Sequence, residues 1–239
     1  MARQTPGPSK TIYGANCVND RKPELNLRKN LQAKIPEPRA GGEKKILILY
    51  SEFPQDYVCK KLIPMIIFET ERLVVRRFSE NDHDNFFSVN GSEEVMRYIR
   101  PAKTKEECDE FLLQVIAYSE KEKLFGRWAV ENKESKEFVG SFALIPVEGK
   151  DQMQLGYALK PEHWGKGYAT ELTVAGLEYV FSKTAIDPIY AYTESVNLPS
   201  QRVLLKAGFM PKGNSAAGEK AVAAFKLSKA DYLQRRAGV

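Results

Sequence analysis

A Gly-x-Gly turn in the middle of the chain joins a strand-like segment to a helix that is apolar over most of its surface. Residues 152–160 have the pattern of a strand, and Gly165 and Gly167 follow it. From there the spacing predicts a helix that runs to about Lys183. Its polar residues are spaced seven and four apart and therefore share one stripe. They are Glu171, Glu178 and Ser182. A helix with so little polar surface is expected to lie buried against a sheet.

The rest of the ordered pattern begins at Thr70 and alternates between strand and helix signals. Strand-like runs lie at 73–75, 127–132, 138–147, 152–160, 189–193, 209–211 and 221–227. Helix signals start at 79–82 and cover 104–123, 167–183, 198–207 and 228–236. Short turn-like separators between residues 127 and 160 predict a meander of antiparallel strands. The sequence thus predicts an α+β fold, with a mixed, mostly antiparallel sheet and helices on both faces.

The basic charge of the chain is confined to its N-terminal quarter. The 239 residues have a formal net charge of +5. Residues 1–64 contain 12 Lys and Arg against 6 Asp and Glu, whereas the other 175 residues contain 24 and 25. Residues 1–64 also hold 7 of the 13 prolines. Because dense prolines block helix propagation, we expect most of 1–43 to be extended or disordered. The predicted organisation is a basic, proline-rich extension over 1–64 and one domain over 65–239.

Three interpretations of residues 1–64 stay open. The segment can be a linker, an upstream fusion or sequence that precedes a true start at Met65. It can also be a targeting segment, because residues 1–19 contain no acid, or a nucleic-acid-binding arm. Residues 1–19 carry only two basic residues, and no cluster rich in Lys and Arg occurs, so both of these have weak support. Residues 43–50 have the pattern of a short strand. We expect no nucleic-acid partner.

The cysteines and histidines do not form a recognisable site. The cysteines at positions 17, 59 and 108 are odd in number and far apart, and the histidines at 83 and 163 stand in different segments. This pattern excludes a disulfide framework and offers no metal site, and it fits a reducing, cytoplasmic setting. The longest apolar runs, 46–50 and 62–68, are much shorter than the roughly 20 residues that a bilayer crossing needs. We therefore expect neither a metal cofactor nor a membrane partner.

The turn at residues 160–171 has the chemistry of an anion site. Glycine tolerates backbone angles that other residues resist, so several amides can point into one concavity at a helix start. The first amides of a helix lack internal partners and lie at the positive end of its dipole. A pyrophosphate is a natural ligand there, although plain turn chemistry explains a Gly-x-Gly as well. The Rossmann and Walker patterns are both incomplete, because Thr170 replaces a glycine and no Gly-Lys-Ser/Thr follows.

A second motif about 30 residues downstream makes the interpretation of this loop more specific. It combines Asn197, Ser200, Lys206, Gly208 and Phe209 in the pattern N-x-x-S-x-x-x-x-x-K-x-G-F. Together the two motifs resemble the GNAT superfamily of acyl-CoA-dependent N-acyltransferases, whose pyrophosphate loop Q/R-x-x-G-x-G/A aligns with residues 164–169. Three further stretches, 70–73, 156–157 and 165–171, look like the ribosomal-protein N-terminal acetyltransferase branch (RimJ/RimL-type). The resemblance covers about residues 66–235.

The resemblance implies transfer of an acetyl group from acetyl-CoA, as co-substrate, to a primary amine by direct attack in a ternary complex. The strand before the loop is then expected to part from its neighbour, so that its free amides, those of Ala158 and Leu159, bind the pantetheine arm and polarise the thioester carbonyl. Implied cofactor contacts are Ala158, Leu159, Trp164, Gly165, Lys166, Gly167, Tyr168, Ala169, Thr170 and Asn197. Implied catalytic residues are Ser200, as a donor to the departing sulfur, and Asn197. Alternatives stay open for three of these: Lys166 as a solvated lysine, Asn197 as a helix N-cap and Ser200 as an ordinary first-turn residue.

Two departures from the family pattern affect the chemistry. Many members carry a tyrosine acid seven residues after the asparagine, and Leu204 at that position cannot donate a proton. Relatives often place a glutamate on the strand before the loop, where Gln154 cannot act as a base. A water chain, Glu194 or Tyr192 can replace it, or the amine arrives unprotonated. His163 is expected to be a solvated or packed histidine rather than the base.

The acceptor and the assembly are not specified by any motif. A peptide or protein N-terminus and a small-molecule amine both fit, and so does either a monomer or a homodimer. An alternative is an acyl-CoA-binding sensor or scaffold without catalysis on the same fold. A nucleic-acid-binding protein with an acyltransferase-like body is a third interpretation.

Overall fold

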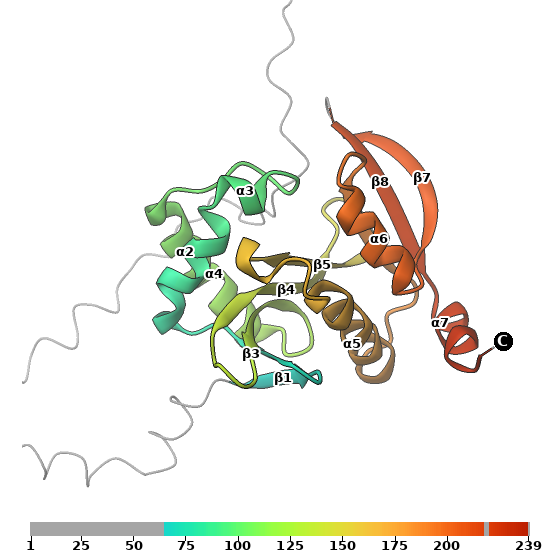
Figure 1. Cartoon of the computed structure of the whole chain (residues 1–239), viewed down its shortest axis with the longest axis horizontal. Helices are drawn as coiled ribbons and strands as arrows, with labels where there is room; N and C mark the ends of the chain where they lie inside the picture. Colours follow the sequence, from blue (N-terminus) through green and yellow to red (C-terminus); the bar gives the residue numbers. More distant parts are fainter. Residues whose placement is uncertain (1–64, 218–219, 239) are drawn as a thin grey trace, which may run out of the picture. The chain divides into compact units, whose positions relative to one another are not determined.

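In the part of the chain that the structure describes, eight strands form one sheet in the order β1-β2-β3-β4-β5-β6-β8-β7 (Figure 1). The structure is a computed structural model, and it describes residues 65–217 and 220–238. The strands are β1 (Ile66–Glu69), β2 (Leu73–Arg77), β3 (Gly126–Asn132), β4 (Phe138–Pro146), β5 (Met153–Leu159), β6 (Ile189–Glu194), β7 (Met210–Ala217) and β8 (Lys220–Leu227). Neighbouring strands from β1 to β5 are antiparallel, as are β6, β8 and β7, and a parallel contact between β5 and β6 joins the two parts. The predicted mixed, mostly antiparallel sheet is confirmed.

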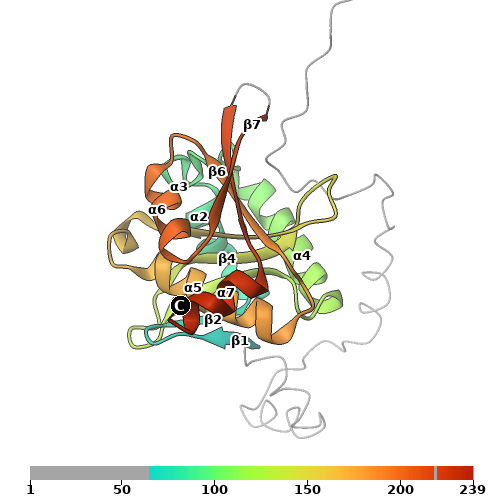
Figure 2. The ribbon, with the colours of Figure 1, turned by 90° about the vertical axis from the view of Figure 1, so that its right-hand side faces the viewer.

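Helices cover both faces of the sheet, as predicted (Figures 1 and 2). They are η1 (Glu80–Asp82), α2 (His83–Asn90), α3 (Glu93–Met96), α4 (Lys105–Lys121), η2 (Pro161–His163), α5 (Tyr168–Lys183), α6 (Leu198–Lys206) and α7 (Lys229–Arg236). On one face, α5 buries Leu172 and Leu177 in a core shared with Phe142. A second core, which includes Phe86 on α2 and Leu112 on α4, lies on the other face. None of the described helices is long and apolar enough to cross a membrane.

Three elements differ from the sequence predictions. The pattern did not predict β1, which is only four residues long, or α3, which is a single turn. It also ended the strand at 209–211 too early, because Pro211 and Gly213 signal a turn. The structure continues this strand as β7 to Ala217, with a bulge between these two residues. An edge strand tolerates a proline because one side of it needs no amide donor. The predicted strand at 43–50 and the rest of the 1–64 extension lie outside the described residues.

We expect Gly176→Ala to destabilise the protein, although alanine normally favours a helix over glycine by about 1 kcal/mol. A Cβ at Gly176 would lie 2.3 Å from Cζ of Phe142 and 3.2 Å from Cδ1 of Leu155. Phe142 is fully buried and stacked on Trp128, so it cannot withdraw. The expected loss of about 1–3 kcal/mol in the free energy of unfolding can be measured by denaturant titration. Val174→Ala, at an exposed position of the same helix, is the control, and a more stable Gly176→Ala protein would contradict the packing argument.

Candidate active site

β5 and β6 part after two residue pairs, which opens a gap in the sheet at the carboxyl end of β5. Met153 pairs with Ile189 and Gln154 with Tyr190. No further pairing joins these two strands, both of which the structure describes in full. The parting that the family resemblance implies is therefore present.

The edge of β5 along this gap presents the amides of Tyr157 and Leu159. The amide of Lys160, directly after β5, donates to the carbonyl of Val139 on the neighbouring strand β4 at 3.0 Å. Successive amides of a strand point to opposite edges, so the amide of Ala158 faces β4 as well. This corrects the orientation expected of Ala158. Leu159 has the expected orientation, and Tyr157 takes the place of Ala158 on the free edge.

Trp164 turns back onto the end of β5. Its indole Nε1 donates to the carbonyl of Leu159 at 2.7 Å, while the residue as a whole stays exposed. That carbonyl lies on the same edge as the amide of Leu159, where a continuing β6 would otherwise bond it. The indole thus satisfies the strand end in place of a neighbouring strand and anchors the start of the loop.

The loop before α5 presents a run of backbone amides that have no acceptor among the described residues. Gly165 and Gly167 have φ angles of +71° and +82°, which a side chain would strain. Gly167 is the N-cap of α5 and provides no capping side chain. No hydrogen bond from the amides of residues 165–170 to another described residue is present. Unpaired amides at a helix start fit an anionic group, so the loop fits the pyrophosphate of acetyl-CoA.

Arg72, in the turn between β1 and β2, holds the loop and the first turn of α5 together. Its Nε donates to Oε2 of Glu171 at 2.7 Å, and its backbone amide donates to Oε1 at 2.9 Å. Thr70 Oγ1 donates to the same Oε1 at 2.5 Å. Arg72 Nη1 donates to the carbonyl of Lys166 at 3.0 Å. Because the carbonyl and the next amide of a planar peptide point in opposite directions, this bond turns the amide of Gly167 away from Arg72.

The charge of Glu171 is compensated within this cluster. Burial raises the pKa of Glu171, but the hydrogen bonds from Thr70 and Arg72, together with the charge of Arg72, outweigh burial and hold that pKa below its ordinary value. The carboxylate is therefore ionised at neutral pH and paired, so it opposes a nearby anion less than a free carboxylate would. The sequence singled out 70–73 and 165–171 as family-like stretches. It gave no sign that they contact each other across about 100 positions.

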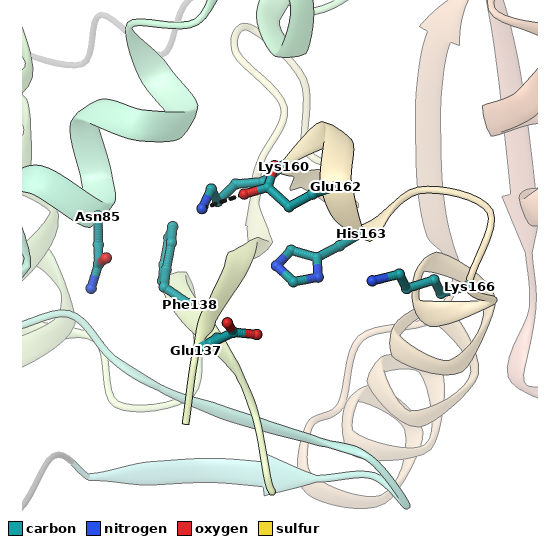
Figure 3. A pocket seen from close by; sticks show the side chains of 7 residues that line it. All are labelled: Asn85, Glu137, Phe138, Lys160, Glu162, His163 and Lys166. Atoms are coloured by element: carbon teal, nitrogen blue, oxygen red, sulfur yellow. Dashed lines mark ion pairs between the residues drawn. The ribbon is translucent and has the colours of Figure 1, made fainter. Parts of the chain in front are cut away.

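A hollow of about 380 Å³ lies beside the loop on the side of α2 (Figure 3). It is lined by Asn85, Glu137, Phe138, Lys160, Glu162, His163 and Lys166. Lys160 pairs with Glu162 at 2.5 Å, and the side chain of Lys166 extends toward His163. His163 is buried, and its ring centroid lies 6.1 Å from that of Tyr168. This is the packed histidine that was one of the two expectations. Two lysines and two glutamates leave the lining without a strong net charge.

The start of α6 brings Asn197 and Ser200 to the gap. Asn197 is the N-cap, and its Oδ1 accepts the amide of Ser200 at 3.3 Å. Ser200 Oγ lies 3.3 Å from the hydroxyl oxygen of Tyr157 on β5, and either hydroxyl can be the donor. Leu204 is buried. A tyrosine therefore reaches Ser200 after all, from a different element than the family pattern suggests.

Tyr157 is the residue that sequence reasoning missed. The only signal was the Gly156-Tyr157 pair, which shows neither the direction of the side chain nor its neighbour. Burial raises the pKa of Tyr157, and the hydrogen bond with Ser200 offsets this only in part. The phenol consequently keeps its proton throughout the neutral range and can act as a donor.

The residues considered as bases lie near the start of the gap. Gln154 is part of the last β5–β6 pair. Tyr192 donates its hydroxyl to Oε1 of Gln152 at 2.7 Å, and burial raises its pKa, so it is a poor base at neutral pH. Glu194, at the end of β6, is buried. Within 65–217 and 220–238, no group of three or more His, Cys, Asp or Glu side chains is placed to hold a metal ion.

Residues 72–210 match a family model described as an acetyltransferase (GNAT) domain. This segment is more than half of the chain, and it contains the gap, the loop and the start of α6. The chain belongs to the GNAT acetyltransferase family. Membership supports an enzyme that transfers an acetyl group to an amine, with acetyl-CoA as the donor that the family implies.

Relatives of this GNAT protein, and solved structures of other proteins with a similar fold, agree with the assignment. An uncharacterized N-acetyltransferase of Bacillus subtilis, YoaA, is 31% identical over 150 residues, which are 62% of this chain and 84% of the relative. A spermidine N-acetyltransferase from Vibrio cholerae, solved with CoA and spermine, has a TM-score of 0.57 and 21% identity over 67% of this chain and 98% of its own. A ribosomal L7/L12 α-N-protein acetyltransferase, RimL, solved with coenzyme A, has a TM-score of 0.58 and 15% identity over 68% and 97%. At these identities the two solved structures share the fold only.

We expect Arg72→Gln to weaken acetyl-CoA binding about 10-fold, because it releases the carbonyl of Lys166 and leaves the Glu171 carboxylate without its counter-charge beside the anion site. The double variant Arg72→Gln/Glu171→Gln should bind more tightly than Arg72→Gln alone, since it lacks the exposed negative charge. Isothermal calorimetry measures both. Lys133→Gln, which removes a cation that pairs with Glu69 at 2.7 Å, is the matched control. A double variant that binds no better than Arg72→Gln would refute the charge-compensation role.

Proposed function

We propose that this protein transfers an acetyl group from acetyl-CoA to the primary amine of a peptide N-terminus or small molecule, by direct attack in a ternary complex. The observation that carries the proposal is the pair of hydroxyls, Tyr157 and Ser200, at the gap between β5 and β6. Beside them stand the unpaired amides of the loop before α5. The hydroxyl pair offers hydrogen-bond donors to a leaving thiolate, and the loop amides offer a binding site for a pyrophosphate.

The proposed cofactor contacts follow the edge of the gap and the loop. The amides of residues 165–170 hold the pyrophosphate, with Trp164 at the start of the loop and Lys166 as a nearby positive charge. The amides of Tyr157 and Leu159 bind the pantetheine arm and polarise the thioester carbonyl. Asn197 caps α6 through Oδ1, so its Nδ2 is left to donate to the same arm.

The two hydroxyls can stabilise the negative charge that develops on the leaving sulfur. As the thioester C–S bond breaks, Ser200 donates its hydrogen bond to the sulfur, and Tyr157 donates to Ser200. A phenol with a raised pKa is a weaker acid than a thiol of pKa about 8.5. The hydroxyl pair therefore stabilises the thiolate mainly by hydrogen bonding, and the attacking amine gives up one proton in the same turnover. A water chain or Glu194 accepts that proton. The amine attacks in its neutral form, either because it arrives unprotonated or because the same groups first remove the additional proton of the ammonium.

The finer assignments are part of the same proposal. The catalytic domain is residues 65–239, the branch is that of the ribosomal-protein N-terminal (RimJ/RimL-type) acetyltransferases, and the setting is cytoplasmic. The assembly is a monomer or homodimer, without a nucleic-acid partner or a metal. A sensor without catalysis is less well supported, because binding alone has no use for a Tyr157–Ser200 pair. A thiol-release assay over a panel of amines separates the two, since a sensor binds acetyl-CoA and releases no thiol.

We expect Gly167→Glu to abolish acetyl-CoA binding, because it places a carboxylate against the pyrophosphate. The control is Gly167→Gln, which shares the strain of a side chain at φ +82° and its contact with Arg72 but not the charge. Calorimetry should show that Gly167→Glu binds at least about 10-fold more weakly than Gly167→Gln, which corresponds to about 1.4 kcal/mol of repulsion. Equal affinities of the two variants would place the pyrophosphate elsewhere.

We expect Ser200→Ala to lower kcat about 10- to 100-fold with a smaller change in KM, as loss of a transition-state hydrogen bond should. Tyr157→Phe should act in the same direction, and the double variant should lose less than the product of the two effects because the hydroxyls act together. Steady-state rates of thiol release test this, with Ser182→Ala on the exposed side of α5 as control. Since burial raises the pKa of Tyr157, its deprotonation should cause no loss of kcat below about pH 10. Unchanged turnover in either single variant would remove that residue from the mechanism.

A further inference from the structure

The face of the sheet that carries α2 and α4 has open space beside the gap. Ala143 on β4 lies opposite Gly156 on β5, and a Cβ at Gly156 would contact nothing within 4 Å. Side chains alternate along a strand, so this face is opposite the one where Tyr157 meets Ser200. An acceptor amine can therefore approach the gap from this side while the leaving sulfur lies toward the other.

Arg127 on β3 is aligned with Ala143 and Gly156 across the three neighbouring strands. It lies opposite Ala143 in the register between β3 and β4, so its side chain projects from the same face. Two strand spacings separate it from Gly156, which is about 10 Å. This distance is within the reach of a small acceptor that spans from the gap to the guanidinium.

Two more cations gather at the same place. The guanidinium carbon of Arg127 lies 5.6 Å from the ring centroid of Phe111 on α4. Arg100 and Lys103, in the segment between α3 and α4, approach that ring at 5.6 and 5.7 Å. Three positive charges thus surround one aromatic ring on the acceptor side of the sheet.

No acid lies within salt-bridge distance of these three cations in the part of the chain that the structure describes, although the charge of Glu107 acts on Arg100. None of the ion pairs present involves Arg100, Lys103 or Arg127. Arg100 donates to the neutral Oδ1 of Asn90 at 2.5 Å. Of two nearby acids on α4, Asp109 contacts His83 and Glu107 accepts the amide of Thr104. Burial lowers the pKa of Arg100 by more than the charge of Glu107 raises it, so this carboxylate compensates Arg100 only in part.

Burial makes this arrangement costly in the absence of a ligand. Burial, together with the charge of Arg100, lowers the pKa of Arg127 to about 10. A partly buried guanidinium beside a like charge is stabilised when an anion is placed against it. A planar carboxylate suits it because the guanidinium can donate two parallel hydrogen bonds to the two oxygens.

We propose that Arg127, with Arg100 and Lys103, binds a carboxylate of the acceptor, so that the enzyme prefers amines that carry a carboxylate over neutral amines and polyamines. This inference rests on the proposed function, because it assigns the acceptor class of the same site. A free amino acid and a peptide with an acidic residue near its N-terminus share the required chemistry. A polyamine carries further ammonium groups, which the three cations repel.

The experiment compares matched acceptors at saturating acetyl-CoA. One arm uses ω-amino acids of increasing chain length and their amides, a second uses Ala-Asp-Ala-amide and Ala-Asn-Ala-amide, and a third uses spermidine. The first two arms distinguish the free amino acid from the peptide. For at least one matched pair, kcat/KM for the carboxylate should exceed that for its amide by about 10- to 100-fold, as a charge-assisted hydrogen bond gives.

Arg127→Gln should abolish this preference without changing the affinity for acetyl-CoA, and Arg127→Lys should keep part of it. Lys121→Gln, at the exposed end of α4, loses the same charge and should behave as the wild type. Arg100→Gln provides a second test if Arg127→Gln loses acetyl-CoA binding. A wild-type protein that prefers the amides or spermidine, or an Arg127→Gln variant that keeps the full preference, overturns the proposal.

A binding measurement keeps this inference separate from the catalytic proposal. If no amine releases thiol, the proposed function fails, and the carboxylate site is then decided by calorimetry. The ω-amino acids are titrated into the protein saturated with CoA. Binding that Arg127→Gln removes supports the site, and binding that is absent or equal in both proteins refutes it.

Discussion

The early parting of β5 and β6 is the constraint on which the site depends. Two residue pairs hold the strands together, and the free edge beyond them exposes the amides of Tyr157 and Leu159. The same gap lets the side chain of Tyr157 meet Ser200 at the start of α6. A sheet that continued its ladder would bury these amides in strand pairing. The indole of Trp164 reduces the energetic cost of the gap, because it donates a hydrogen bond to the carbonyl of Leu159, which β6 does not pair.

Electrostatic compensation is distributed differently on the two sides of this gap. At the loop before α5, the carboxylate of Glu171 is bonded by Arg72 and Thr70, so the helix N-terminus keeps its positive character. On the opposite face, Arg100, Lys103 and Arg127 surround Phe111 without a salt bridge to any described residue. Residues 65–239 have nearly balanced charge overall. The local arrangement of that charge therefore favours an anion at each of the two positions.

The spacing of apolar residues predicted most helices and strands, because an element that buries one face repeats apolar residues at its own structural period. The apolar circumference of α5 and the turns around β4 were sufficient to predict a covered sheet and a meander. The pattern failed where an element is too short to show a period, as in β1 and α3. It failed again in β7, where Pro211 and Gly213 signal a turn but an edge strand accommodates them as a bulge.

The sequence by itself determined the two motifs, the glycines of the loop, the N-cap at Asn197 and the absence of a tyrosine at position 204. These are local properties, fixed by backbone freedom and residue type within a few positions. Only the tertiary structure decided that Tyr157 reaches Ser200, that Arg72 pairs with Glu171 and that the amide of Ala158 faces β4. These relations depend on strand register and on contacts between segments that are 43 and 99 positions apart. A single sequence does not encode such contacts as a readable pattern, because many partners satisfy the same hydrogen-bonding and burial requirements.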